Sequence, residues 1–226
     1  MTESIREYSE YRIPRQMLGD QEYDGHLSIH DDQMAEDLGF SGAPIEGPTH
    51  FSQFIHLLHD YFGDVWFEQG CISAHYQNMV VEGEEIRASI DIPAEQSALI
   101  RIGAEKRDGT PVLTGTASIG PDYGETEIDL RMARLRPAGQ LVILSDLEVG
   151  QKGSGNPEDA VMDYDQNMGA FYPFSLSLKL GCITETHDFY TDQGAESSPW
   201  GRSVIPLEMI SVLASYNNQS GFRARG

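Results

Sequence analysis

Residues 45–62 read IEGPTHFSQFIHLLHDYF, and this stretch decides the fold that the sequence predicts. Its large apolar residues recur at helical spacing and form one strongly apolar face: Phe51, Phe54, Ile55, Leu58 and Phe62. Proline is tolerated in a first helical turn, so Gly47-Pro48 predicts the start of the helix, and Gly63 predicts its end.

Segments with the composition of strands follow this helix: 71–81, 86–92, 98–107 and 110–120. The last two flank Asp108-Gly109, and Asp-Gly between alternating apolar residues is a strong hairpin signal. A short helix is also expected before the long one. A long helix covered by one antiparallel sheet is an α+β arrangement, which we expect for a domain of residues 1–122.

A second copy of this pattern is predicted after a connector of residues 123–160, in a C-terminal unit of residues 161–226. With a shift of 160 residues, DQMAEDLGF (32–40) aligns with DQGAESSPW (192–200). GAPIEGPTHFSQFI is then echoed by GRSVIPLEMISVL. These matches predict two structurally related halves.

The second copy differs from the first in two respects. It is preceded by YPFSLSLKLGCIT (172–184), which has strand character and is expected to form a strand. Its apolar helix, expected over 206–218, is followed only by QSGFRARG. We therefore expect the second half to be completed by further residues or by a partner chain.

The composition excludes several classes of function. Among 226 residues, 36 acidic and 15 basic side chains give a formal net charge of −21, which would repel nucleic acid. The sequence lacks the run of about 20 apolar residues that a membrane helix needs, and its N-terminus lacks the pattern of a secretory signal. We expect a cytoplasmic protein in which Cys71 and Cys182, without CxxC spacing, are buried thiols.

Several of these features together resemble the MaoC-like hydratase family. They are an Ala-x-x-x-Gly-Phe helix, Gly-x-Pro-Ile-x-Gly, a long apolar helix and a run of strands. The resemblance extends over residues 20–122, is weaker over 140–226, and is carried by His30, Asp32, Ala35, Gly39, Phe40, Gly42, Pro44, Ile45 and Gly47. It implies a hot-dog fold, as a double hot-dog with the second half degenerate or incomplete.

The resemblance also implies an activity. Members of this family hydrate enoyl thioesters, or dehydrate 3-hydroxyacyl thioesters, without a metal or an organic cofactor. The implied partner is a small acyl thioester, with coenzyme A as one candidate carrier, and neither nucleic acid nor a membrane is implied. Hot-dog sheets usually pair edge to edge, so the resemblance implies a homodimer or a higher homo-oligomer.

The catalytic residues expected from the resemblance are Asp24, His26 and His30. In the family, an aspartate lies five residues before a histidine within Gly-Asp-x-Asn-Pro-x-His, and the two activate water. Here Asp24 lies six residues before His30, and Asn-Pro is absent. An imidazole that a carboxylate holds in one tautomer can supply one role in acid–base catalysis, and a second titratable group the other. For the neighbouring aspartates, capping of a helix start is the alternative.

The start of the long helix is expected to bind the substrate. Exposed amides and the helix dipole there can polarise a thioester carbonyl. Because Pro48 has no amide, Gly47 and Thr49 are the expected donors. His50 is the third candidate for substrate binding, with packing or capping as its alternative role.

Four further histidines are interpreted mainly as structural. His56 and His59 lie one helical turn apart, which could hold a metal ion, but the chain lacks the HExxH pattern, so we expect them on the helix surface. His75 and His187 are secondary candidates for the catalytic site.

Three functions remain open from the sequence. The first is a hydro-lyase of the hot-dog class that acts on an acyl thioester or a related small unsaturated acid. The second is a thioesterase on the same scaffold, which would release a thiol. The third is a non-catalytic subunit that pairs with an active homologue.

Overall fold

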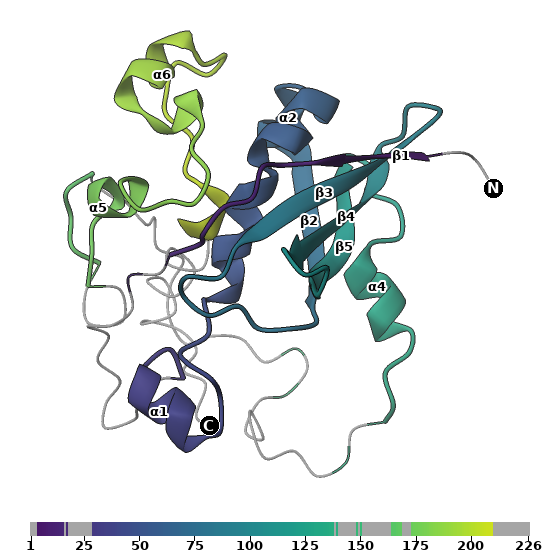
Figure 1. Cartoon of the computed structure of the whole chain (residues 1–226). Coiled ribbons are helices and arrows are strands. Elements are labelled where there is room, and N and C mark those ends of the chain that lie inside the picture. The colour runs from purple at the N-terminus through teal and green to yellow at the C-terminus, as the bar shows by residue number, and fades with distance from the viewer. Residues whose placement is uncertain are drawn as a thin grey trace.

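The computed structural model describes residues 4–15, 17, 29–137, 139, 148, 150, 164–168 and 173–209 (Figure 1). It is a mixed α+β structure with one antiparallel sheet, in agreement with the expected fold class. The strands are β1 (Ser4–Tyr8), β2 (Gly70–Tyr76), β3 (Ile86–Pro93), β4 (Leu99–Lys106) and β5 (Pro111–Ile119). The α-helices are α1 (Asp32–Asp37), α2 (Ile55–Phe62), α3 (Val65–Gln69), α4 (Glu127–Met132), α5 (Leu176–Leu180) and α6 (Asp192–Ser197). The 3₁₀ helices are η1 (Gly47–Phe54), η2 (Asp188–Tyr190) and η3 (Leu207–Met209).

The sheet has the strand order β1-β3-β4-β5-β2, and all neighbours are antiparallel. The predicted strands appear as β2 to β5, in sequence order. The hairpin between β4 and β5 turns at Asp108-Gly109, where Gly109 has a φ of 86° and the Thr110 amide donates to Asp108 Oδ1 at 2.9 Å. Glycine adopts this positive φ without the steric cost that a side chain would carry.

The long predicted helix is formed by η1 followed directly by α2, which ends at Gly63 as expected. Its first eight residues are 3₁₀ rather than α, a run longer than 3₁₀ helices usually reach. Phe54, Ile55 and Leu58 are almost completely buried and belong to the main hydrophobic cluster, to which β3, β4 and β5 also contribute. The sheet therefore covers the apolar face of this helix.

Strand β1 is an element that the sequence did not predict. Its five residues, SIREY, are all exposed, so they carry no apolar alternation that would indicate a half-buried strand. Pairing with β3 places Arg6 opposite Asp91, and Arg6 Nε lies 2.6 Å from Asp91 Oδ1. Main-chain pairing and this cross-strand ion pair, rather than burial, hold the edge strand in place.

The prediction of a strand over 172–184 is wrong for the residues that the structure describes, because they contain helix α5 instead. Ser175 caps this helix, since its side chain accepts a hydrogen bond from the Leu178 amide at 3.3 Å. Leu176 and Leu180 face the core, whereas Leu178 is 57% exposed. The leucines that face the core are thus four residues apart, which is helical spacing, although Ser and Leu alternate in the sequence.

The predicted internal repeat has a counterpart in the secondary structure. Helices α1 and α6 begin at Asp32 and Asp192, and η1 and η3 begin at Gly47 and Leu207, so the same shift of 160 residues relates both pairs. The side chains of Asp31 and Thr191 cap α1 and α6 in the same way, by accepting from the amide three residues on. Most of the helix expected over 206–218 lies outside the described residues, and the division into domains stays a prediction.

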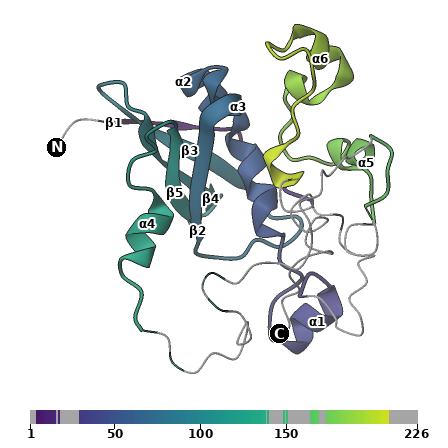
Figure 2. The same cartoon turned by 180° about the vertical axis from the view of Figure 1, so that it is seen from behind.

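The C-terminal segments pack on the other side of the central helix from the sheet (Figures 1 and 2). They share its core, because the main hydrophobic cluster is contacted by side chains of this region: Leu180, Ile183, Tyr190, Val204 and Leu207. η3 lies directly against η1. Cys71 and Cys182 are free and half-buried rather than fully buried. Among the described residues, no helix has the length and apolar character that a membrane crossing requires.

Replacing Leu58 by Ala is expected to lower the free energy of unfolding by about 2 to 5 kcal/mol, because it leaves a cavity between the central helix and the sheet. The same change at the exposed Leu178 is the matched control and should cost much less. Urea unfolding of both variants measures the difference. Equal losses would contradict the placement of the core.

Candidate functional site

The start of η1 is where the structure brings several titratable side chains together. Of the residues that the sequence assigned to this site, His30, Gly47, Thr49 and His50 are described. Asp24 and His26 lie outside the described residues, so their approach to His30 stays a prediction.

His30 lies in the turn before α1, and its ring is held in one orientation. Its Nδ1–H donates to the carbonyl oxygen of Pro44 at 2.6 Å, because a carbonyl can only accept. In the neutral ring, Nε2 is therefore the nitrogen that can accept a proton. The two aspartates that follow are structural: Asp31 caps α1 and Asp32 Oδ1 accepts from the Ala43 amide at 3.0 Å.

The two expected amide donors differ in their surroundings. The Thr49 amide donates to the Glu46 carbonyl at 3.0 Å, within the first turn of η1. The helix thus already uses this amide, and the substrate-binding role that the sequence assigned to Thr49 stays a prediction. Gly47 packs against Tyr76, whose Cζ would lie 2.8 Å from a Cβ atom at position 47. Only glycine allows the Tyr76 ring to lie so close.

His50 is buried rather than open to a ligand. Its Nδ1 accepts a hydrogen bond from Gln53 Nε2 at 3.1 Å. Burial lowers the pKa of His50 to about 4, so the ring is neutral at physiological pH. These contacts fit the packing role that the sequence left as the alternative.

Three residues that the sequence analysis did not select complete this cluster: Glu46, Lys179 and Glu208. Glu208 on η3 is 3% exposed, and its Oε1 lies 4.0 Å from Nζ of Lys179 on α5, which is 5% exposed. Burial raises the pKa of Glu208 to about 7, and the positive charge of Lys179 opposes this shift. Burial also raises the pKa of Glu46, and the charges of His30 and Lys179 oppose that shift. We call His30, Glu46, Lys179 and Glu208 the acid–base cluster.

The acid–base cluster has the properties of a catalytic site in two respects. A carboxyl group with a pKa near 7 can both donate and accept a proton at physiological pH, which ordinary glutamates cannot. Buried groups with mutually shifted pKa values also concentrate at functional sites. No local motif marks Glu208 or Lys179 in the sequence, because their partner Glu46 belongs to a distant segment.

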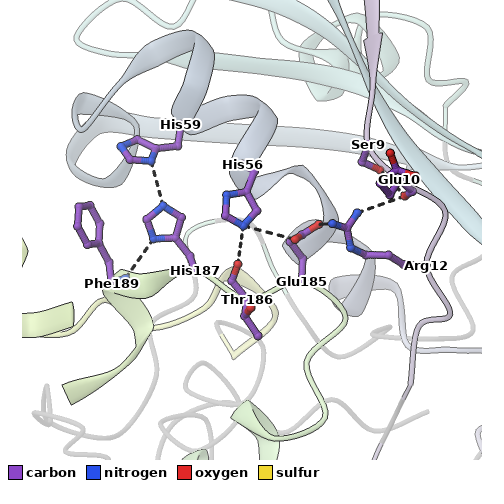
Figure 3. A network of polar contacts seen from close by, with 9 residues as sticks. All are labelled: Ser9, Glu10, Arg12, His56, His59, Glu185, Thr186, His187 and Phe189. Atoms are coloured by element: carbon purple, nitrogen blue, oxygen red, sulfur yellow. Dashed lines mark hydrogen bonds and ion pairs between the residues drawn. The ribbon is translucent and has the colours of Figure 1, made fainter. Parts of the chain in front are cut away.

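A second polar cluster lies at the other end of the central helix (Figure 3). His187 Nε2 lies 2.9 Å from His59 Nδ1, and His59 Nε2 lies 2.9 Å from Asp64 Oδ1. His56 Nε2–H donates to the Thr186 carbonyl at 2.6 Å. His56 and His59 are therefore on the helix surface, as expected, but they hold a C-terminal segment. No group of described residues has the composition and geometry of a metal site.

Two surface hollows involve the C-terminal segments, and neither is lined by a residue of the acid–base cluster. One, of about 380 Å³, is lined by Phe67, Glu68, Trp200, Arg202, Ser203 and Val204. The other, of about 490 Å³, lies along η2 and α6. Neither hollow includes a residue that the sequence assigned to the catalytic site.

Comparison with known proteins leaves the family of this chain open. No family model and no curated protein matches it. Among solved structures, the (R)-hydratase from A. caviae involved in PHA biosynthesis is similar over 53% of this chain and 96% of that chain. The sequence identity is 16% and the TM-score is 0.35. At this level of similarity, the function has to be argued from the site itself.

The buried carboxyl of Glu208 gives a pH-dependent prediction for stability. Because its pKa is raised in the folded state, the folded protein binds more protons than the unfolded chain between pH 4.5 and about 7. Wild type should therefore gain stability relative to Glu208→Gln as the pH falls from 8 to 5.5, by on the order of 2 kcal/mol.

Urea unfolding of both proteins at the two pH values measures this gain. The exposed Glu95 supplies the control, since a Glu95→Gln variant should differ from wild type by the same amount at both pH values. A stability difference for Glu208→Gln that does not change with pH would show that the Glu208 carboxyl is not shifted.

Proposed function

We propose that the protein is a hydro-lyase that adds water to, or removes water from, an enoyl or 3-hydroxyacyl thioester or a related small unsaturated acid. The observation that carries the proposal is the acid–base cluster at the start of η1, in which a carboxyl group titrates near neutral pH. The sequence resemblance of residues 20–122 to MaoC-like hydratases agrees with this chemistry.

Hydration of a conjugated double bond needs one proton acceptor and one proton donor. In the proposed reaction, His30 Nε2 takes a proton from water as its oxygen bonds to the β carbon. The electron pair of the double bond moves to the α carbon, which takes a proton from the neutral carboxyl of Glu208. Glu208 ends as a carboxylate and His30 as an imidazolium, and a proton returns from one to the other through solvent. Dehydration is the same sequence reversed.

The remaining sequence-derived residues have supporting roles in this proposal. Asp24 and His26 would either orient the His30 ring or act as the base in its place, as the family pattern implies. The Gly47 amide at the start of η1 would face the thioester carbonyl, where a donor stabilises the enolate that forms in the transition state. The proposed chemistry needs no metal and no organic cofactor.

The scaffold proposed for this activity is a double hot-dog. It is supported by the central helix that the sheet covers and by the shift of 160 residues that relates α1 to α6 and η1 to η3. In this proposal, residues 1–122 are the active half, 123–160 the connector and 161–226 the second half, which supplies Lys179 and Glu208 to the site. We further propose a cytoplasmic homodimer or higher oligomer whose acyl substrate is carried by coenzyme A.

Activity assays on a set of enoyl-coenzyme A thioesters of different chain lengths test the proposal. Hydration removes the ultraviolet absorbance of the conjugated double bond without releasing a thiol. The variants His30→Ala, Asp24→Asn and Glu208→Gln should each lower turnover by about 100-fold or more, because each removes a proton-transfer group. Glu95→Gln, at an exposed position, is the matched control and should retain full activity.

Each result of this assay has a defined meaning. Full activity in both His30→Ala and Asp24→Asn, or in Glu208→Gln, would show that the assigned residues are wrong. A wild-type protein that hydrates none of the thioesters would overturn the proposed hydro-lyase activity. Release of thiol without loss of the double bond would instead identify a thioesterase.

A second candidate function is a non-catalytic subunit that pairs with an active homologue. The observation that favours it is the packing at the start of η1, where Tyr76 lies against Gly47 and the Thr49 amide is already hydrogen-bonded. This candidate predicts a protein that is inactive alone in both assays but changes the activity of a catalytic hot-dog protein co-expressed with it.

A further inference from the structure

The cluster of His56, His59 and His187 has no role in the proposed reaction, although it ties two distant parts of the chain together. His56 and His59 lie on α2, and His187 lies on the segment 185–190 that follows α5 (Figure 3). The three rings are close, with centroids 5.3 Å apart for His56 and His187 and 4.9 Å apart for His59 and His187. We call this contact the histidine clasp.

We propose that the histidine clasp is a pH-sensitive latch that holds segment 185–190 on α2 at neutral pH and releases it on acidification. The inference goes beyond the proposed function and does not depend on it, because it concerns how the C-terminal segments are attached to the central helix.

The directions of the hydrogen bonds in the clasp carry the argument. The Phe189 amide donates to His187 Nδ1 at 3.1 Å, so that nitrogen accepts and the ring carries its proton on Nε2. His187 Nε2–H then donates to His59 Nδ1 at 2.9 Å. His59 in turn donates through Nε2–H to Asp64 Oδ1 at 2.9 Å. Every nitrogen of the two rings is therefore used, with one proton on each ring.

A second proton on either ring breaks this chain. On His187 it would sit on Nδ1 and point at the Phe189 N–H, and on His59 it would sit on Nδ1 and point at His187 Nε2–H. In both cases two N–H donors would face each other. The contact is partly buried, so the lost hydrogen bond would not be replaced by one to water. The hydrogen bonds of the clasp as built therefore accommodate one proton on each of the two rings.

Charged groups from all the surrounding elements act on His187. His56 and His59 on α2 disfavour its protonated form, whereas Asp60 on the same helix and Asp188 on its own segment favour it. Burial is the largest effect, and with the two histidines it lowers the pKa of His187 to about 4. In the folded protein the ring therefore resists a proton that it would accept near pH 6.5 when the segment is detached.

The pH window follows from this lowered pKa. The latch is fully closed above about pH 6.5 and loses its stability progressively as the pH falls from 6.5 towards 4, since the detached segment then binds the proton. Glu185, the neighbouring charged residue, forms an ion pair at 2.8 Å with Arg12 from the N-terminal segment, and burial raises the pKa of its carboxyl. Because its pKa is raised, the attached segment holds a proton on Glu185 more tightly than the detached segment does, so Glu185 acts in the opposite direction to His187.

Hydrogen–deuterium exchange of the full chain at pH 7.5 and pH 5 tests the proposal, with rates corrected for the chemical exchange of free amides at each pH. Protection of peptides covering 183–191 should fall by about tenfold at pH 5 relative to peptides of β4. The variant His187→Phe keeps an aromatic ring but cannot titrate, so its protection in this segment should no longer fall at pH 5. His75→Gln, the matched control, should respond as wild type does.

Three results would overturn the latch. They are an unchanged protection ratio in the wild type, a His187→Phe variant that keeps the full pH response, and a parallel loss of protection in β4, which would indicate global unfolding instead. If His187→Phe does not fold, the ring-proton NMR titration of wild-type His187 decides. A midpoint well below 6.5 supports the proposal, and a midpoint near 6.5 overturns it.

Discussion

The burial of one apolar face of the central helix against the sheet is the constraint on which the rest of the structure depends. Phe54, Ile55 and Leu58 lose nearly all contact with water there, which is the largest favourable contribution that this helix can make to folding. The same packing carries the polar start of the helix into the interior. His50 and Gln53 are buried with it and form a hydrogen bond to each other, because buried polar groups left without partners would destabilise the fold.

Both polar clusters form on the side of this helix that the sheet leaves open, one at each end. At the start, η3 packs against η1 and brings Glu208 close to Glu46. At the end, residues 185–190 bring His187 to His59. The two clusters differ in charge. The first places two carboxyl groups, of which Glu208 is almost fully buried, beside one of the few lysines of a strongly acidic chain. The second is a directional chain of hydrogen bonds between imidazole rings. The first is therefore suited to proton transfer and the second to attachment.

The repeated pattern gives this arrangement a simple basis. If α6 and η3 form a second copy of the segment from α1 to η1, then η1 and η3, which contact each other, are equivalent parts of the two copies. The copies have then diverged in their functional residues. His30 of the first aligns with Tyr190 of the second, a buried aromatic residue, while Glu208 of the second aligns with Pro48 of the first. One composite site between two unequal copies is the arrangement that these differences favour.

The sequence by itself determined the elements whose signals are local. The apolar face between Gly47 and Gly63, the Asp108-Gly109 turn and the shift of 160 residues are periodicities or short motifs, and each has its counterpart in the structure. Tertiary structure alone decided that Leu176 and Leu180 point inward from a helix and that the Thr49 amide is already bound. It also decided that Lys179 and Glu208 lie at the start of η1. Burial and the approach of charges depend on contacts between distant segments, and these contacts, rather than neighbours in sequence, set the protonation of the site.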